Sequence, residues 1–324
     1  MQRERRGTCL HVDELLCIGC GICVEVCPMR ILDLQDSVCV LLDELKCLEC
    51  GGCMRACPKD ALSVKERISK KDSPLVAKPD GTKEGKIQFF PILEELNTLL
   101  KELNPVQVYE CGGADISEFD DFEIEGEQCY TKLYKAEKVE KMGIANINFF
   151  GLMNTSVITI RPAPEYDIPL YSLDWGESEG HTFIYCDLLP SDDPGRNLIY
   201  LTKYLYNSLE DLYQKYSTVP GLKSNVFHWV RAISSPYHIT GTIMNKSQKS
   251  FNMIRSCARD YLNAWIALWK EAQPQDPHSD YMRLVHERRK TIGKLLMEND
   301  PGLGPLNKFL GDKKARIAMS IVEP

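Results

Sequence analysis

Eight cysteines in two identically spaced runs carry the most evident chemistry of this chain. Both runs read C-x2-C-x2-C-x3-C-P, and they comprise Cys17, Cys20, Cys23 and Cys27, then Cys47, Cys50, Cys53 and Cys57. Thiolates at such short intervals can curl around one face of an iron–sulfur cubane, which needs four thiolate ligands. Eight thiolates suffice for two four-iron clusters, so this part of the chain is predicted to carry single electrons.

The spacing resembles that of bacterial ferredoxins with two [4Fe–4S] clusters, in which the fourth cysteine of each run ligates the other run's cluster. The resemblance implies one cluster on Cys17, Cys20, Cys23 and Cys57, and a second on Cys47, Cys50, Cys53 and Cys27. Disulfides are an alternative, but CxxC pairs without a secretory signal favour metal or redox chemistry. Zinc would leave the third and fourth cysteines of each run without a function.

Outside these runs the sequence shows no flavin or nicotinamide site. The segment Gly302-Leu303-Gly304-Pro305 lacks the third glycine of a dinucleotide loop and has a proline where a helix would open. No phosphate-binding loop is present, and the six histidines do not pair at metal-ligand spacing. A substrate that itself stabilises added electrons, such as an extended conjugated pigment, would fit this gap.

Length and charge restrict the class of protein further. A chain of 324 residues with 44% hydrophobic residues is expected to form two domains. The net charge of −7 argues against nucleic acid as a partner. No apolar stretch approaches the roughly 20 residues of a membrane span, and the basic N-terminus lacks the apolar run of a signal peptide. We expect a cytoplasmic monomer that does not bind membranes.

The chain divides into a ferredoxin domain at 1–65, a polar linker at 66–88 and a large domain at 89–324. The two halves of the ferredoxin domain form an internal repeat. In the large domain we expect strands at 106–110, 119–130, 155–161, 170–175 and 182–188. Helices are expected at 92–103, 198–216, 251–269, 281–297 and 306–321. Strands grouped first and helices later predict an α+β protein with a central, mainly antiparallel sheet.

The large domain resembles the ferredoxin-dependent bilin reductases. Arg161 to Trp175 reads R-P-A-P-E-Y-D-I-P-L-Y-S-L-D-W, similar to the family's central-strand signature, in which a proline turn precedes an aspartate. Two further stretches agree, Cys186 to Pro190 and the segment that runs from Glu298-Asn299-Asp300-Pro301 to Gly311. Weaker similarity lies at 128–130 and 234–237.

This resemblance implies an α/β/α sandwich that binds an open-chain tetrapyrrole such as biliverdin between sheet and helices. Electrons would arrive singly from ferredoxin, and side chains would supply protons. By position the proton donors are Asp174 and Asp300, with Asn299 beside the latter. Each added electron raises the basicity of a pyrrole system, so a proton must follow. A carboxylic acid can donate that proton if burial raises its pKa.

The sequence departs from the family in several substrate contacts. Some members place His or Asn on the strand before the proline turn. When this sequence is aligned with the family pattern, that position is Val157 if no gap is introduced and Asn154 if one is. Some members carry a basic residue after the Ser-Pro stretch, which would hold a pigment propionate, and the corresponding residue here is Thr242. Pigment carboxylates still need cations. The candidates are Arg161, Arg231, Lys246 and Arg255.

We therefore expect a bilin reductase whose electron donor is fused to its catalytic domain, supplied by an upstream low-potential donor. A tether raises the local donor concentration to the order of millimolar. Two alternatives stay open: a reductase of another tetrapyrrole, as in the related red chlorophyll catabolite reductases, and a pigment-binding redox sensor without turnover.

Overall fold

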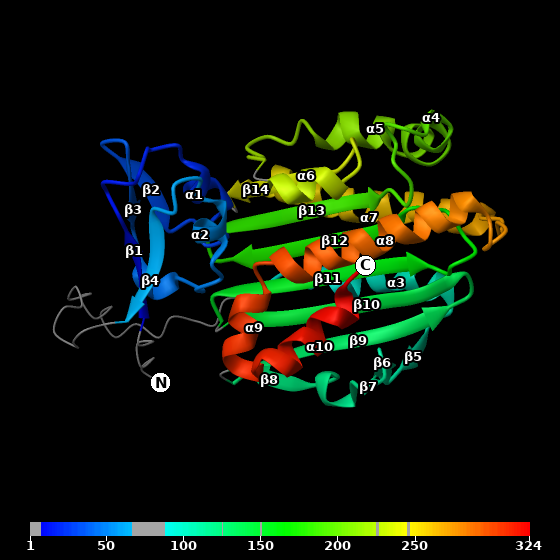
Figure 1. Cartoon of the computed structure of the whole chain (residues 1–324), viewed down its shortest axis with the longest axis horizontal. Helices are drawn as coiled ribbons and strands as arrows, with labels where there is room; N and C mark the ends of the chain where they lie inside the picture. Colours follow the sequence, from blue (N-terminus) through cyan, green and yellow to red (C-terminus); the bar gives the residue numbers. More distant parts are fainter. Residues whose placement is uncertain (1–7, 67–87, 125, 150, 225–226, 245–246) are drawn as a thin grey trace. The chain divides into compact units, whose positions relative to one another are not determined.

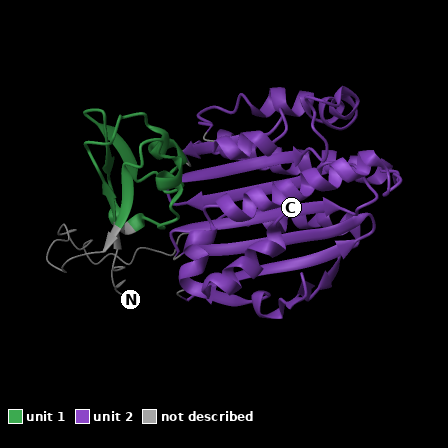
Figure 2. Ribbon diagram, viewed as in Figure 1, with its two compact units in different colours: residues 1–88 green, residues 89–324 purple. Residues whose placement is uncertain are grey.

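The chain forms two compact units, Met1–Gln88 and Phe89–Pro324 (Figure 2). The computed structural model describes residues 8–66, 88–124, 126–149, 151–224, 227–244 and 247–324. The predicted linker at 66–88 therefore lies almost entirely outside the described residues. No helix in the described ranges is long and apolar enough to cross a membrane.

The small unit is built from two equivalent halves. Each half has a strand, a cysteine loop, a short helix and a second strand: β1 (Thr8–Val12), α1 (Ile22–Val26) and β2 (Leu32–Gln35), then β3 (Val38–Leu41), α2 (Gly52–Ala56) and β4 (Leu62–Glu66). β1 pairs with β4 and β2 with β3, all antiparallel. Gly21 and Gly51 precede the two helices with φ of 76° and 71°, a conformation that favours glycine.

The large unit is organised around one antiparallel sheet, as the sequence predicts. Its strand order is β14-β13-β12-β11-β10-β9-β5, and β8 pairs with β9. The bounds are β5 (Val106–Val108), β8 (Phe122–Ile124), β9 (Glu127–Ala136), β10 (Val139–Phe149), β11 (Met153–Pro162), β12 (Leu170–Ser178), β13 (His181–Leu189) and β14 (Ile239–Met244). The small strands β6 (Glu110–Cys111) and β7 (Ala114–Asp115) pair separately.

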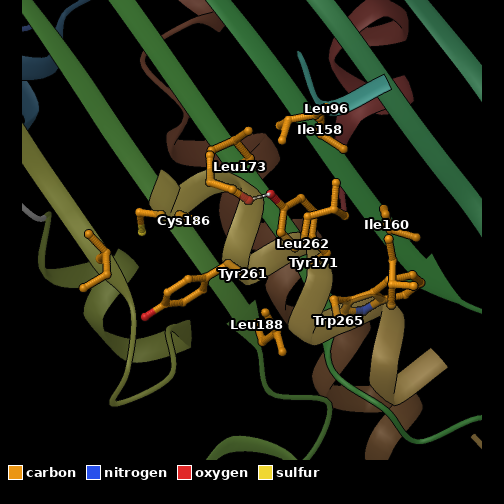
Figure 3. Packing of buried hydrophobic residues seen from close by; sticks show 14 of the residues in the cluster. Leu96, Ile158, Ile160, Tyr171, Leu173, Cys186, Leu188, Tyr261, Leu262 and Trp265 are labelled. Atoms are coloured by element: carbon orange, nitrogen blue, oxygen red, sulfur yellow. Dashed lines mark hydrogen bonds between the residues drawn. The ribbon is translucent and has the colours of Figure 1, made fainter. Parts of the chain in front are cut away.

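Helices cover both faces of this sheet, which confirms the expected α/β/α sandwich (Figure 1). One face carries α3 (Ile92–Leu100), α5 (Asn207–Tyr216) and α7 (Gln248–Glu271), and we call it the α7 face. The other carries α8 (Asp280–Asn299), α9 (Leu303–Leu310) and α10 (Asp312–Val322), and we call it the α8 face. The α7 face holds the main apolar core, a single cluster that includes Leu173 and Cys186 of the sheet and Leu262 and Trp265 of α7 (Figure 3).

The structure differs from the predicted elements in several places. The strand expected at 119–130 is wrong as a single element, because this range spans two paired strands, β8 and the first residues of the longer β9. The helix expected at 306–321 is two helices, α9 and α10, because Gly311 lies between them with φ 75° and ψ 158°. The helix expected at 198–216 contains a π-helical segment (Leu201–Tyr206) between α4 (Leu198–Tyr200) and α5. Strands β10 and β14 and the helix α6 (His228–Ile233) had no counterpart in the prediction.

Candidate functional site

Two hollows in the small unit gather the eight cysteines into two groups. Cys17, Cys20 and Cys23 line the first hollow together with Cys57 from the second run. The second hollow is lined by Cys47, Cys50 and Cys53 together with Cys27. Each hollow thus combines three thiols from one loop with the last thiol of the other loop.

Backbone amides point at several of these sulfurs. Cys39 N–H donates to Cys17 Sγ over 3.4 Å, Glu49 N–H to Cys47 Sγ over 3.4 Å, and Ala61 N–H to Cys57 Sγ over 3.3 Å. Such donors stabilise thiolates that ligate a cluster. Four thiolates with amide donors form a ligand set that fits an iron–sulfur cubane. Among the described residues, no three His, Cys, Asp or Glu side chains are placed to hold a single metal ion.

A second candidate site lies on the α8 face of the large sheet. Strand pairing aligns Val157, Asp174, Tyr185 and Thr240 in one row across four strands, because Asp174 pairs with both Val157 and Tyr185, and Tyr185 pairs with Thr240. Directly opposed residues project to the same face of a sheet. The residues on either side of Asp174 along β12, Leu173 and Trp175, belong to the core of the α7 face. The aspartate therefore projects from the sheet toward α8.

Asp174 is an acid in an unusual state. Burial raises the pKa of its carboxyl to about 7, and the negative charge of Asp300 acts in the same direction. The side chain is nevertheless partly accessible, and it makes no hydrogen bond or ion pair with any residue that the structure describes. The structure thus brings the two predicted proton donors within electrostatic range and leaves one of them free to meet a ligand.

Asp300 and Asn299 lie where α8 ends. Asp300 is the C-cap, and its Oδ1 accepts a hydrogen bond of 2.6 Å from Gly302 N–H. The Asn299 side chain donates to Leu295 O over 2.8 Å and so bonds to its own helix. Both are partly exposed. In this geometry Asn299 stabilises the helix end that positions Asp300.

The strand register places the two candidates for the slot before the proline turn on opposite faces of the sheet. Val157 lies directly opposite Asp174 on β11. Asn154 pairs with Glu177, whose carboxylate accepts hydrogen bonds from Phe90 N–H and from the Trp175 ring on the α7 face. Asn154 therefore belongs to the opposite side of the sheet, and the apolar Val157 is the neighbour of the acid.

Three of the four predicted cations lie within the described residues, and two of these three are bound to other groups of the protein. Arg255, a candidate for the pigment carboxylates, lies on α7, pairs with Glu95 over 2.8 Å and stacks on Phe90, which places it on the face of the sheet opposite Asp174. Arg161 donates to Pro324 O over 2.5 Å and lies 3.6 Å from Glu323, which fixes the C-terminal residues. Arg231 is exposed on α6. Lys246 lies outside the described residues.

Sequence reasoning missed a buried polar cluster that adjoins Asp174. Tyr185 hydroxyl lies 3.3 Å from Asp187 Oδ2 and 2.9 Å from Ser234 Oγ. Asp187 is fully buried and accepts hydrogen bonds from the backbone N–H and the hydroxyl of Ser235. The period-two alternation of Tyr185 and Asp187 on a strand was the signal that could have placed both on the face of Asp174.

Unsatisfied polar atoms mark the same side of the sheet. Among the described residues, the buried side-chain atoms without a hydrogen-bond partner are Thr159 Oγ1, Arg161 Nε and Asn307 Oδ1. Thr159 and Arg161 lie on β11 with the parity of Val157, and Asn307 lies on α9. Buried polar atoms normally have partners, so this region is suited to accept water or a polar ligand.

The raised pKa of Asp174 has a consequence for stability. The folded protein binds this proton more tightly than the unfolded chain does, so stability is lost as pH rises from about 4 through 7. Asp174→Asn removes the ionisation. Above pH 8 we expect the free energy of unfolding of the variant to exceed that of the parent by roughly 1–3 kcal/mol, after allowance for the solvent contact of the side chain. At pH 4 the two proteins should match, and urea titrations at both pH values would test this.

Comparisons with known proteins found matches to both units of the chain. The model of the family "Ferredoxin-dependent bilin reductase" matches residues 96–321, and that of the "4Fe-4S dicluster domain" matches residues 16–61. Among solved structures, phytochromobilin synthase from tomato in complex with biliverdin matches with a TM-score of 0.59 and 18% identity, over 71% of this chain and 81% of that chain. Among curated proteins none matches. The family match spans the sheet and both helical layers, and the chain belongs to the ferredoxin-dependent bilin reductases.

Proposed function

We propose that this protein reduces a double bond of a linear tetrapyrrole such as biliverdin, with its α8 face as the pigment site. The observation that carries the proposal is Asp174, an acid with a pKa near 7 that projects from the sheet and has no partner among the described residues. The family match supports the reaction class. The biliverdin in the tomato protein supports the class of substrate.

We propose further that the eight cysteines hold two [4Fe–4S] clusters, with ligands divided as the two hollows divide them. When bound, such clusters supply electrons one at a time. Two clusters match the two electrons that one double bond requires. Fusion of these ligands to the catalytic unit keeps the electron source at a high effective concentration.

Side chains of the large unit would supply the protons for the reduction. An electron added to the pigment raises its basicity, and the neutral carboxyl of Asp174 can then donate its proton to a carbon or nitrogen of the pigment. Asp300, close enough to act electrostatically on Asp174, is the proposed second donor, and it would first take up a proton from solvent because its charged form cannot donate one. Two electrons and two protons complete the reduction of one double bond in this stepwise radical scheme.

Anaerobic incubation with biliverdin and a chemical reductant tests the proposal, with the products identified by chromatography. We expect a reduced bilin that forms only in the presence of the protein. A parallel reaction with an open-chain chlorophyll catabolite tests the alternative substrate. Pigment that binds and returns unchanged under all these conditions would contradict the reductase function and support a sensor.

The pH dependence of this reaction should report Asp174. Because its pKa is about 7 and the acid form is the donor, the turnover rate should fall about tenfold per unit above pH 7. Asp300→Asn removes a charge that raises this pKa, so the falling limb should move to lower pH. Rate–pH profiles of both proteins, measured with the same reductant, give the comparison; an unmoved limb would mean that Asp300 does not act on the donor.

A further inference from the structure

We propose that Tyr185 binds the pigment by accepting a hydrogen bond from a pyrrole or lactam N–H. This inference rests on the proposed function and adds a substrate contact to it. It follows from the position of Tyr185 in the strand register and from the distribution of hydrogen atoms around its hydroxyl.

The register places Tyr185 next to the proposed proton donor. Tyr185 on β13 pairs directly with Asp174 on β12. Directly paired residues of antiparallel strands have Cβ atoms about 4.5–5.5 Å apart and share a face. The tyrosine side chain is partly accessible, and it packs beside a small apolar cluster that includes Leu170, Ile233 and Ile292. A ligand on Asp174 would therefore meet the tyrosine as well.

The hydrogen bonds around the hydroxyl define its direction. Ser234 has one hydroxyl proton, which it donates to Val230 O over 2.8 Å. In the 2.9 Å contact between Tyr185 and Ser234, the serine must then accept and the tyrosine must donate. Asp187 Oδ2, at 3.3 Å, is a second acceptor for the same proton. The single proton of Tyr185 is thus directed at Ser234 and Asp187.

The acceptors themselves are firmly held. Asp187 Oδ1 accepts the Ser235 hydroxyl over 2.5 Å, and its Oδ2 accepts the Ser235 N–H over 2.8 Å. Asp187 and Ser235 are both buried. His238, whose Nδ1 lies 2.7 Å from Ser235 O, extends the cluster, and its ring centroid is 6.3 Å from that of Tyr185. Such a connected set gives the tyrosine oxygen little freedom to reverse its proton.

Because the Tyr185 hydroxyl already donates its proton within this cluster, its oxygen can take part in a further hydrogen bond only as an acceptor. Linear tetrapyrroles carry N–H groups along their inner edge and on their terminal lactams, so they match an acceptor. Asp174, in its neutral form, presents a donor in the same row. An acceptor and a donor on neighbouring strands would fix both the position and the orientation of one pyrrole ring.

Binding of biliverdin to Tyr185→Phe in the full-length protein tests the inference. Loss of one hydrogen bond to the ligand should raise the dissociation constant about tenfold and shift the absorption band of the bound pigment. Tyr171→Phe is the matched control. Tyr171 lies on β12, faces α7 and donates to Ala258 O over 3.2 Å, so its loss should leave the dissociation constant within about twofold.

Ser234→Ala provides an independent variant that keeps the tyrosine. It removes one acceptor of the Tyr185 proton and should weaken binding by about threefold, because the hydroxyl can then turn. An unchanged dissociation constant in Tyr185→Phe, or an equal loss in Tyr171→Phe, would overturn the inference. Parent protein that binds biliverdin would in that case leave the proposed function standing, whereas parent protein that binds no pigment would refute both.

Discussion

Asp174→Asn is expected to lower the rate of pigment reduction by about two to three orders of magnitude. The substitution keeps the shape of the side chain and removes the proton that the carboxyl would donate in the proposed reaction. Binding should change little, because the parent carboxyl is neutral below pH 7 and the amide is neutral as well. The measurement is single-turnover reduction of bound biliverdin by a chemical reductant at pH 6, followed by absorption. A radical state of the pigment should accumulate, since electrons still arrive.

Asp260→Asn is the matched control for this experiment. Asp260 lies on α7, away from the α8 face, and its carboxylate accepts from Tyr216 over 2.5 Å and pairs with Lys215 over 3.2 Å. Its substitution should cost stability and leave the rate of reduction within about threefold, because the contact is structural. If Asp174→Asn also stayed within threefold of the parent, the assignment of the donor would be wrong.

Pairs of cysteine substitutions should leave different iron contents, depending on whether the two cysteines line the same hollow or different hollows. The parent should hold about eight irons, four in each cluster. Cys20→Ser combined with Cys57→Ser removes two ligands from one hollow, so about four irons should remain. Cys20→Ser combined with Cys27→Ser removes one ligand from each hollow, and both clusters should be depleted. Iron analysis after anaerobic reconstitution separates the two results.

The same experiment rejects the alternative ligand set. If each cysteine run held its own cluster, the pair Cys20 and Cys27 would retain four irons and the pair Cys20 and Cys57 would lose both clusters. Cys111→Ser, in the large unit, is the control and should keep the full iron content. All variants should bind biliverdin as the parent does. Reduction by a protein donor should fall at least tenfold wherever a cluster is lost.

The features predicted well from sequence are those that depend on local spacing or on strand alternation. The cysteine loops can be read from short intervals because the ligands of one loop are neighbours in the chain. Asp174 can be placed on a strand because Leu173 and Trp175 flank it. The division of the sequence into a cysteine-rich unit and a sheet-forming unit also follows from local composition.

The features that could not be predicted depend on partners distant in sequence. Whether Val157 or Asn154 meets the acid depends on the register between β11 and β12, which no local pattern defines. Arg255 was a plausible cation until its partner proved to be Glu95, 160 residues away. Strand β10 mixes good helix formers such as Glu140, Lys141 and Met142 with few β-branched residues, and only its two neighbours hold it in the sheet.

The alternation along β12 also bears on how this protein can change over evolutionary time. Leu173 and Trp175 are fully buried in the core of the α7 face, so most substitutions there should be removed by selection against unfolding. Asp174, between them, lies outside that core, so what limits its substitution is the proton transfer proposed for it and not the packing of Leu173 and Trp175. Alternate residues of one strand therefore serve stability and chemistry separately, and a change on the α8 face need not disturb the core of the α7 face.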